Sequence, residues 1–269
     1  MMSITTILQQ QYHSIQTEQI RYQNNPYDPE RVHDLRVAIR TLRGLVKFLK
    51  REMPLEAYET LDKTLSNAAK IFSPLRDLDV LIVEAGAFAY AHPEGKANYR
   101  DFFKMFDNKR HEEMQQTLVD SVQQELTVDL DQVKAQLKTV NFNHVPDWTK
   151  LIAKELKRRK HQLIKQYDHL DFQDYPRVHH VRKKAKTLRY SATYFAEFVP
   201  KKAEKIRRQA KRVQDVCGSI TDAHVNYVAL NQLASQTTDD NNRALLLRIA
   251  QAQREKFTSI KKARKSSYL

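Results

Sequence analysis

The chain has 269 residues but only four glycines, eight prolines and one cysteine. Because helix-breaking residues are so few and good helix formers dominate, the composition predicts an all-α protein. The single cysteine, Cys217, excludes an internal disulfide and fits the reducing cytoplasm, where we expect the protein. No run of eighteen apolar residues occurs, and residues 1–16 lack the regions of a signal peptide, so neither a membrane span nor secretion is expected.

Positive charge is abundant and unevenly distributed. The net charge is +14, and the sequence pI is about 9.7. Residues 31–51 hold seven Lys/Arg and one acid, and residues 177–212 hold thirteen and two. These two segments together carry +17, so the remainder of the chain carries −3. The basicity therefore belongs to particular sites and indicates an anionic partner.

The two basic segments contain an internal repeat. Residues 31–43 read RVHDLRVAIRTLR and residues 177–189 read RVHHVRKKAKTLR, with seven of thirteen positions identical. Lys186 stands where the first copy has Arg40, so the charge is kept although the residue differs. Because the repeat preserves cations as well as apolar spacing, it predicts that both copies contact something anionic.

On an α-helix, the cations of each copy recur every three or four residues and so share one face. We call the two sets the first stripe (His33, Arg36, Arg40, Arg43, Lys47) and the second stripe (His179, Arg182, Lys186, Arg189). Each lies about 100° around the helix from an apolar stripe. This flank position predicts cations at the rim of the core or in a groove between helices. Fourteen residues of helix span about 21 Å, enough to follow an extended ligand.

Prolines and capping residues divide the chain into about ten helices. Asp28-Pro29 is expected to open the first-stripe helix, and Ser73-Pro74 to cap a later one. A long helical stretch from about 97 to 140 is expected to kink at residues 127–129, and a helix from 200 is expected to end at Gly218-Ser219. The second-stripe helix is expected to run to Phe198.

Residues 141–146 are the best candidate boundary between two halves. We predict two helical bundles of about four to five helices each, at residues 1–140 and 141–269. The internal repeat would relate them by a pseudo-twofold axis around a basic central groove. A second repeated element supports this: residues 76–80 (RDLDV) match residues 221–225 (TDAHV). We predict a structural role for Asp77 and Asp222, such as anchoring a stripe arginine, with acid–base catalysis as the alternative.

These motifs resemble the CHAD family of histidine-containing α-helical domains. The similar segments are VHDLRVAIRTLR and PLRDLDVL in the first half, and VHHVRKKAKTLRYSATYF and CGSITDAHV in the second. The resemblance implies two four-helix-type bundles around a basic channel that binds inorganic polyphosphate without catalysis. Thr221 departs from the pattern where arginine is expected. The E-x-E-x-K motif of fused triphosphate-hydrolysing domains is absent, so we expect a stand-alone module.

The predicted function is therefore non-catalytic binding of polyphosphate, with other polyanions as further ligands and association with polyphosphate granules as a possible role. Arginine offers bidentate contacts to phosphate oxygens, and lysine offers a point charge. No catalytic residue, metal ligand or cofactor is predicted. The predicted binding residues are His33, Arg36, Arg40, Arg43, Lys47, Arg76, His179, Arg182, Lys183, Lys186, Arg189 and Lys211.

Two alternatives remain open. RNA or single-stranded DNA would also bind to rows of cations, although the stripes lack the interleaved aromatic residues that stack on bases. A metal-dependent phosphohydrolase is suggested by His33-Asp34. The second copy replaces this aspartate by His180, and adjacent residues on a helix point about 100° apart, which disfavours a shared metal site.

Overall fold

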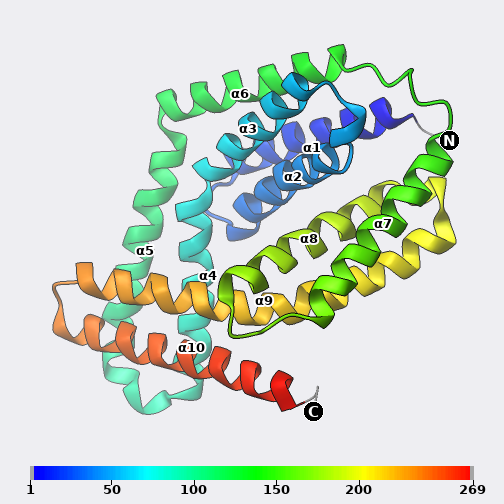
Figure 1. The fold of residues 1–269 in the computed structure, drawn as a ribbon. Helices are drawn as coiled ribbons and strands as arrows, with labels where there is room; N and C mark the ends of the chain where they lie inside the picture. The colour runs from blue at the N-terminus through cyan, green and yellow to red at the C-terminus, as the bar shows by residue number, and fades with distance from the viewer. Residues whose placement is uncertain (1–2, 267–269) are drawn as a thin grey trace.

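A computed structural model describes the backbone of residues 3–266, and their side chains except at 95–97 and 260–266. Within this range the chain forms ten α-helices and three short 3-10 helices, without a strand. The all-α prediction is confirmed. The helices (Figure 1) are α1 (Ile4–Asn24), α2 (Pro29–Phe48), α3 (Leu55–Ile71), α4 (Ser73–Ala91), α5 (Lys96–Leu118), α6 (Asp120–Thr139), α7 (Trp148–Asp168), α8 (Tyr175–Tyr194), α9 (Pro200–Gln236) and α10 (Asp240–Ser266), with 3-10 turns at Lys50–Glu52, Pro93–Gly95 and Ala196–Phe198. None of the helices in the described range is long and apolar enough to cross a membrane.

The helix that carries the first stripe begins where the sequence predicts. Asp28 is its N-cap, and the carboxylate accepts a hydrogen bond of 2.9 Å from the backbone N–H of Glu30. Pro29 occupies the first turn, where a missing N–H costs nothing. Asp147 caps α7 in the same way. Local capping chemistry therefore sets the start of both helices.

The break between α5 and α6 lies at Val119, so the predicted kink at residues 127–129 is wrong. Side chains fix the break at its true place: Gln123 Nε2 donates 2.5 Å to the carbonyl oxygen of Thr117, near the end of α5. The Thr117 hydroxyl also bonds to the buried hydroxyl of Tyr22 on α1. Thr127 instead bonds to the carbonyl oxygen of Gln123 within α6 and stays helical.

α9 runs unbroken for 37 residues, so the predicted end at Gly218-Ser219 is also wrong. Glycine in a helix interior costs only about 1 kcal/mol relative to alanine. The buried neighbours Cys217 and Ile220 keep this segment packed. A Cβ at Gly218 would lie 3.6 Å from Arg182 Nε, an ordinary van der Waals contact, so α9 passes beside Arg182 of α8 at this point. The second-stripe helix is shorter than predicted, since a 3-10 turn replaces its last residues.

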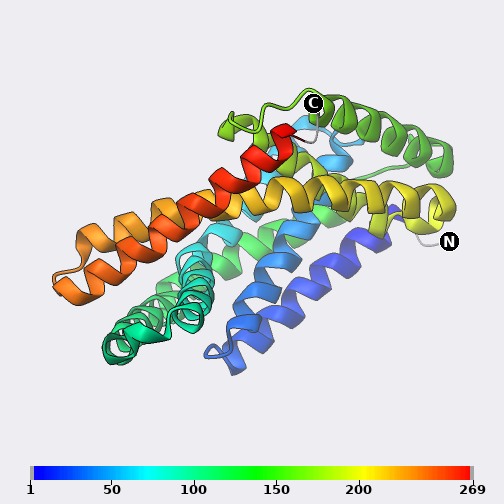
Figure 2. The same cartoon turned by 90° about the horizontal axis from the view of Figure 1, so that it is seen from below.

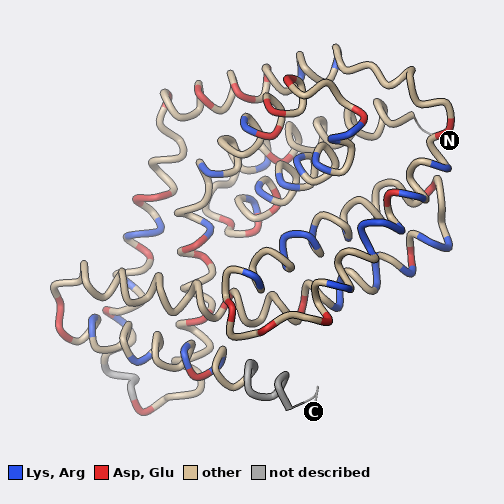
Figure 3. The backbone as a smooth tube through the Cα atoms, in the orientation of Figure 1, with Lys and Arg blue, Asp and Glu red and all other residues tan. Residues whose placement is uncertain are grey.

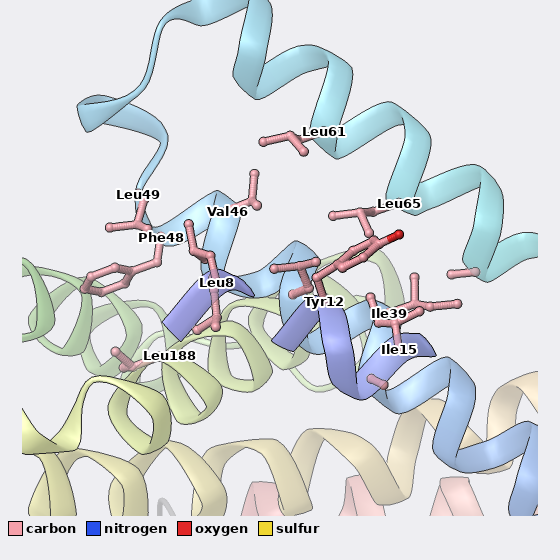
Figure 4. Packing of buried hydrophobic residues seen from close by; sticks show 14 of the residues in the cluster. Leu8, Tyr12, Ile15, Ile39, Val46, Phe48, Leu49, Leu61, Leu65 and Leu188 are labelled. Carbon is pink, nitrogen blue, oxygen red and sulfur yellow. The ribbon is translucent and has the colours of Figure 1, made fainter. Parts of the chain in front are cut away.

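The buried apolar residues form two clusters. The larger draws mainly on α1, α2, α3, α6, α7, α8 and the first half of α9, and Figure 4 shows part of it. The smaller one joins α4 and α5 to the second half of α9 and to α10. α9 and α10 lie side by side in both views (Figures 1 and 2). Both clusters take residues from both sides of residue 140. The division at 140 and the pseudo-twofold axis stay predictions.

The two stripe helices, α2 and α8, pack directly against each other (Figure 1). Gly44 of α2 meets the Tyr190 ring of α8, and a Cβ at Gly44 would lie 3.7 Å from that ring. At the end of α2, the rings of Phe48 and Phe195 are 5.2 Å apart. The distance at Gly44 is an ordinary van der Waals contact, so the two cation-bearing helices lie close enough here for direct side-chain packing.

Candidate functional site

The two stripes come together across the contact between α2 and α8. The charge of Arg40 acts on the pKa values of Lys186 and His179 on the other helix, and Lys186 acts on that of His33. Arg40 and Lys186 are equivalent positions of the repeat, as are His33 and His179. Each helix thus places its central cation, Arg40 or Lys186, near the histidine of the other helix, and these two cations are also neighbours of each other. Figure 3 shows many lysines and arginines along α2, α7 and α8. We call the two rows together the paired stripes.

Lys186 is the most perturbed cation of the paired stripes. Burial, and then the charges of Arg40, Arg182 and Arg189, lower its pKa to about 7 from an ordinary 10.5. Burial also lowers the pKa of Arg40, although this side chain is open to solvent. Positive charge is therefore concentrated here at a cost to the folded state.

Removing the Lys186 charge is expected to stabilise the protein. The pKa of Lys186 is about 7 when folded and 10.5 ordinarily, so the unfolded state binds more protons between these values. The cost is full below pH 7, and stability recovers as pH rises toward 10.5. Allowing for solvent screening, Lys186→Met should add about 1–2 kcal/mol at pH 6, or about 2–8 °C in Tm.

Thermal unfolding of wild type and Lys186→Met across pH 6–11 measures this effect. The difference in Tm should shrink as pH rises and vanish near pH 11. Lys104→Met on α5, an exposed lysine, is the control and should show no such trend. A variant less stable than wild type at pH 6 would contradict the repulsion that we describe.

An aspartate lies beside one arginine of each stripe, as the predicted anchoring by Asp77 and Asp222 requires. Arg182 Nη2 lies 2.8 Å from Asp222 Oδ1, and Arg36 Nη1 lies 3.9 Å from Asp77 Oδ1. Arg36 also donates 3.1 Å to the Ser73 hydroxyl. Ser73 therefore does not cap α4 as predicted: α4 has no side-chain cap, and the hydroxyl donates to the carbonyl oxygen of Ala69. These contacts orient each guanidinium.

The end of the first stripe is partly neutralised by one carboxylate. Asp62 Oδ1 on α3 lies 2.5 Å from Arg43 Nε and 3.4 Å from Lys47 Nζ. Although burial opposes it, the Arg43 hydrogen bond lowers the pKa of Asp62. Positive charge without a close acid is thus greatest at the centre of the paired stripes and lower at Arg43 and Lys47.

The pKa values of both stripe histidines are lowered from the ordinary 6.5, which favours the neutral rings. Burial lowers the pKa of His33, and the charge of Arg76 lowers it further. Burial likewise lowers that of His179, followed by Lys183 and Arg182. The Nδ1 atom of His179 is buried and has no hydrogen-bond partner among the residues that the structure describes. A nearby anion would oppose these shifts and draw protons onto both rings.

The three predicted site residues outside the stripes have different surroundings. Arg76 on α4 is an electrostatic neighbour of His33 and Arg36, so it belongs with the paired stripes. Lys183 is a neighbour of His179 and also lines a pocket on the other side of α8. Lys211 forms an exposed ion pair of 2.6 Å with Asp215 on its own helix, so a carboxylate already balances its charge.

Two arginines in the basic run at residues 157–160 have clear structural contacts. Arg159 donates to the carbonyl oxygens of Lys47 and Phe48, at 3.0 and 3.1 Å, and so caps the C-terminal end of α2. Glu155, three and four residues earlier, holds both Arg158 and Arg159. Because burial is outweighed by these hydrogen bonds, the pKa of Glu155 falls to about 2. The spacing of three and four residues between Glu155 and the two arginines is the sequence signal that predicts these ion pairs on a helix.

Among the side chains that the structure describes, no group of three or more His, Cys, Asp or Glu is placed to hold a metal ion. Fold and site thus define an all-helical protein in which two repeated helices bring their cations together. A family model for the CHAD domain matches residues 6–231. The chain belongs to the CHAD domain family.

Two solved structures share this fold. The CHAD domain from the plant Ricinus communis aligns with a TM-score of 0.72 and 19% identity, over 98% of this chain and 89% of that one. PptA from Streptomyces chartreusis aligns with a TM-score of 0.69 and 12% identity, over 98% and 97%. No curated protein sequence matches the chain significantly. At these identities the structural likeness establishes the fold alone.

Proposed function

We propose that the protein binds inorganic polyphosphate along the paired stripes and does not catalyse its turnover. The observation that carries this proposal is the crowding of Arg40, Arg182 and Arg189 around Lys186, whose pKa is lowered to about 7 first by burial and then by these charges. Such a cluster costs folding energy, because like charges are held close together. A phosphate chain would remove the repulsion and return a proton to Lys186. Family membership supports the proposal.

Polyphosphate suits the paired stripes better than nucleic acid does. It has no bases, so its receptor needs closely spaced cations and no stacking platform. The aromatic ring at the centre, Tyr190, packs on Gly44 and has the cations of Lys186 and Arg189 at 5.6 and 4.9 Å from its centre. These contacts already occupy the ring, which disfavours stacking on a base. Tyr190 therefore serves packing and cation–π contacts.

A direct comparison of ligands tests the proposal. Long-chain polyphosphate, single-stranded DNA and RNA of equal total charge would be titrated against the protein at two salt concentrations. Polyphosphate should bind most tightly at both. Tighter binding of either nucleic acid would replace the proposal by the nucleic-acid alternative, and the absence of polyphosphate binding would refute it.

Catalysis is not expected. A row of similar cations holds each phosphate of the chain alike, so it stabilises the bound polymer and not one transition state. Incubation with polyphosphate or nucleoside triphosphates, with Mg²⁺ or Mn²⁺, should release no more phosphate than a variant with Arg182, Lys186 and Arg189 replaced by alanine. Phosphate release that disappears in His33→Ala or Asp34→Ala would revive the metal-dependent phosphohydrolase.

A further inference from the structure

A second basic surface lies on the opposite flank of α8 from the second stripe. Two pockets of about 470 and 570 Å³ adjoin between α7 and α8 and share Gln162, His180 and Lys184 in their walls. On a helical wheel, Lys184 lies about 160° from Lys186. We call the two pockets together the α7–α8 groove. It is distinct from the paired stripes, although α8 carries both.

The lining of the α7–α8 groove is cationic. Its walls, all within the described residues, contain seven lysines and arginines and no aspartate or glutamate. Besides Lys47 and Lys183, these are Arg158, Arg159, Lys165, Arg177 and Lys184. Burial, and then the charges of Lys184 and Lys183, lower the pKa of His180 in the same wall. The groove therefore has a positive potential.

Some of these cations are already balanced, and others are not. Glu155 pairs with Arg158 and Arg159, and Asp174 lies 3.7 Å from Arg177. Lys183 and Lys184 have no carboxylate within 4 Å among the residues that the structure describes. Lys184 instead spans the groove to Gln166 Oε1 at 3.0 Å, a neutral partner that an anion can replace.

The α7–α8 groove adjoins the paired stripes. Lys47, the last residue of the first stripe, lines the 470 Å³ pocket of the groove together with Lys183. Lys183 also acts on the pKa of His179 in the second stripe. Between Arg177 and Leu188 the groove follows α8 for about 17 Å. Lys183 therefore connects the second stripe to the α7–α8 groove. Among the described residues, no acidic side chain forms an ion pair with it at this crossing.

We propose that the α7–α8 groove is a second polyphosphate-binding site, filled by the same chain that occupies the paired stripes. This inference rests on the proposed function. A chain long enough to cross α8 at Lys183 engages both surfaces, whereas a short one fills only one. Joining two sites by one ligand multiplies affinity. The protein therefore favours long chains over short ones.

The double variant Arg177→Gln/Lys184→Gln tests the groove, because neither residue belongs to the paired stripes. Its affinity for long-chain polyphosphate should fall by about 10–100-fold. The matched control, Arg100→Gln/Lys104→Gln, removes one exposed arginine and one exposed lysine from α5 and should bind like wild type. Equal affinity of the groove variant and the control variant would overturn the inference.

Chemical acylation of lysines gives a second measurement on the unaltered protein. Phosphate oxygens hold an ammonium group protonated and unreactive, so saturating polyphosphate should slow acylation of Lys184 about tenfold or more. The rate at Lys104 should not change. An unprotected Lys184 would refute the groove while leaving the paired stripes intact. Protection of Lys184 together with normal binding by stripe variants would instead refute the proposed role of the stripes.

Discussion

Raising the salt concentration from 50 to 200 mM should weaken polyphosphate binding by about 10³–10⁵-fold, if some six to ten phosphates are neutralised. This magnitude is carried over from nucleic acids, where each neutralised phosphate releases a bound counterion. The two basic segments with a combined charge of +17 supply enough cations for that number of contacts. Affinity measured by titration at four or more salt concentrations gives the slope.

The slope also distinguishes specific contacts from general attraction. The stripe variants described next should have a shallower slope, because fewer phosphates are neutralised in their complexes. The α5 control, Arg100→Gln/Lys104→Gln, should keep the wild-type slope. Binding that does not respond to salt would show that ion pairs do not hold the ligand, and it would remove the electrostatic basis of the proposal.

Replacing Arg182, Lys186 and Arg189 by alanine should reduce the affinity for polyphosphate about 10³-fold or more, because hydrogen bonds to charged groups contribute about 1.5–3 kcal/mol each. Replacing Arg36, Arg40 and Arg43 should have an effect of similar size. The reason is the close approach of the two rows, which brings both to one ligand. Isothermal titration of both triple variants gives the measurement.

The triple variants are expected to stay folded. Like-charge repulsion is relieved at the centre, and the aspartate freed by loss of Arg182 is exposed. Asp62 keeps Lys47 as a partner when Arg43 is removed. Thermal unfolding serves as the control, with a Tm no lower than that of wild type by more than a few degrees. If either triple variant binds polyphosphate normally, that row is not part of the site.

Local signals in the sequence predicted much of the helix pattern. Asp28-Pro29 and Asp147 mark helix starts through their own side-chain chemistry, and these predictions hold. The breaks were harder because they depend on distant partners. The break at Val119 follows the last turn of α5. The hydroxyl of Tyr22, about a hundred residues away, helps to fix that turn through its hydrogen bond with Thr117. Gly218 resembles a helix end in sequence, yet it lies inside α9, where its neighbours Cys217 and Ile220 are buried by distant helices.

In the candidate site, too, local features could be predicted from the sequence, whereas features that depend on distant partners could not. The spacing of His33, Arg36 and Arg40 predicts one helical face, and the repeat predicts a second, but neither tells how the faces lie together. The link between Arg40 and Lys186 arises only from packing of α2 on α8. The α7–α8 groove could not be found from sequence, because Lys184 lies outside the stripe and its opposite wall comes from another helix.

The smaller hydrophobic cluster joins helices from distant parts of the chain, so during synthesis it cannot be completed until the last helix has been made. Phe102 and Phe106 of α5 pack in the smaller cluster with Leu246 and Ile249 of α10, near the other end of the chain. At common rates of translation, the α5 side chains wait roughly 7–30 s for these partners to leave the ribosome. During that interval Phe102 and Phe106 of the nascent chain lack the α10 side chains that cover them in the folded protein.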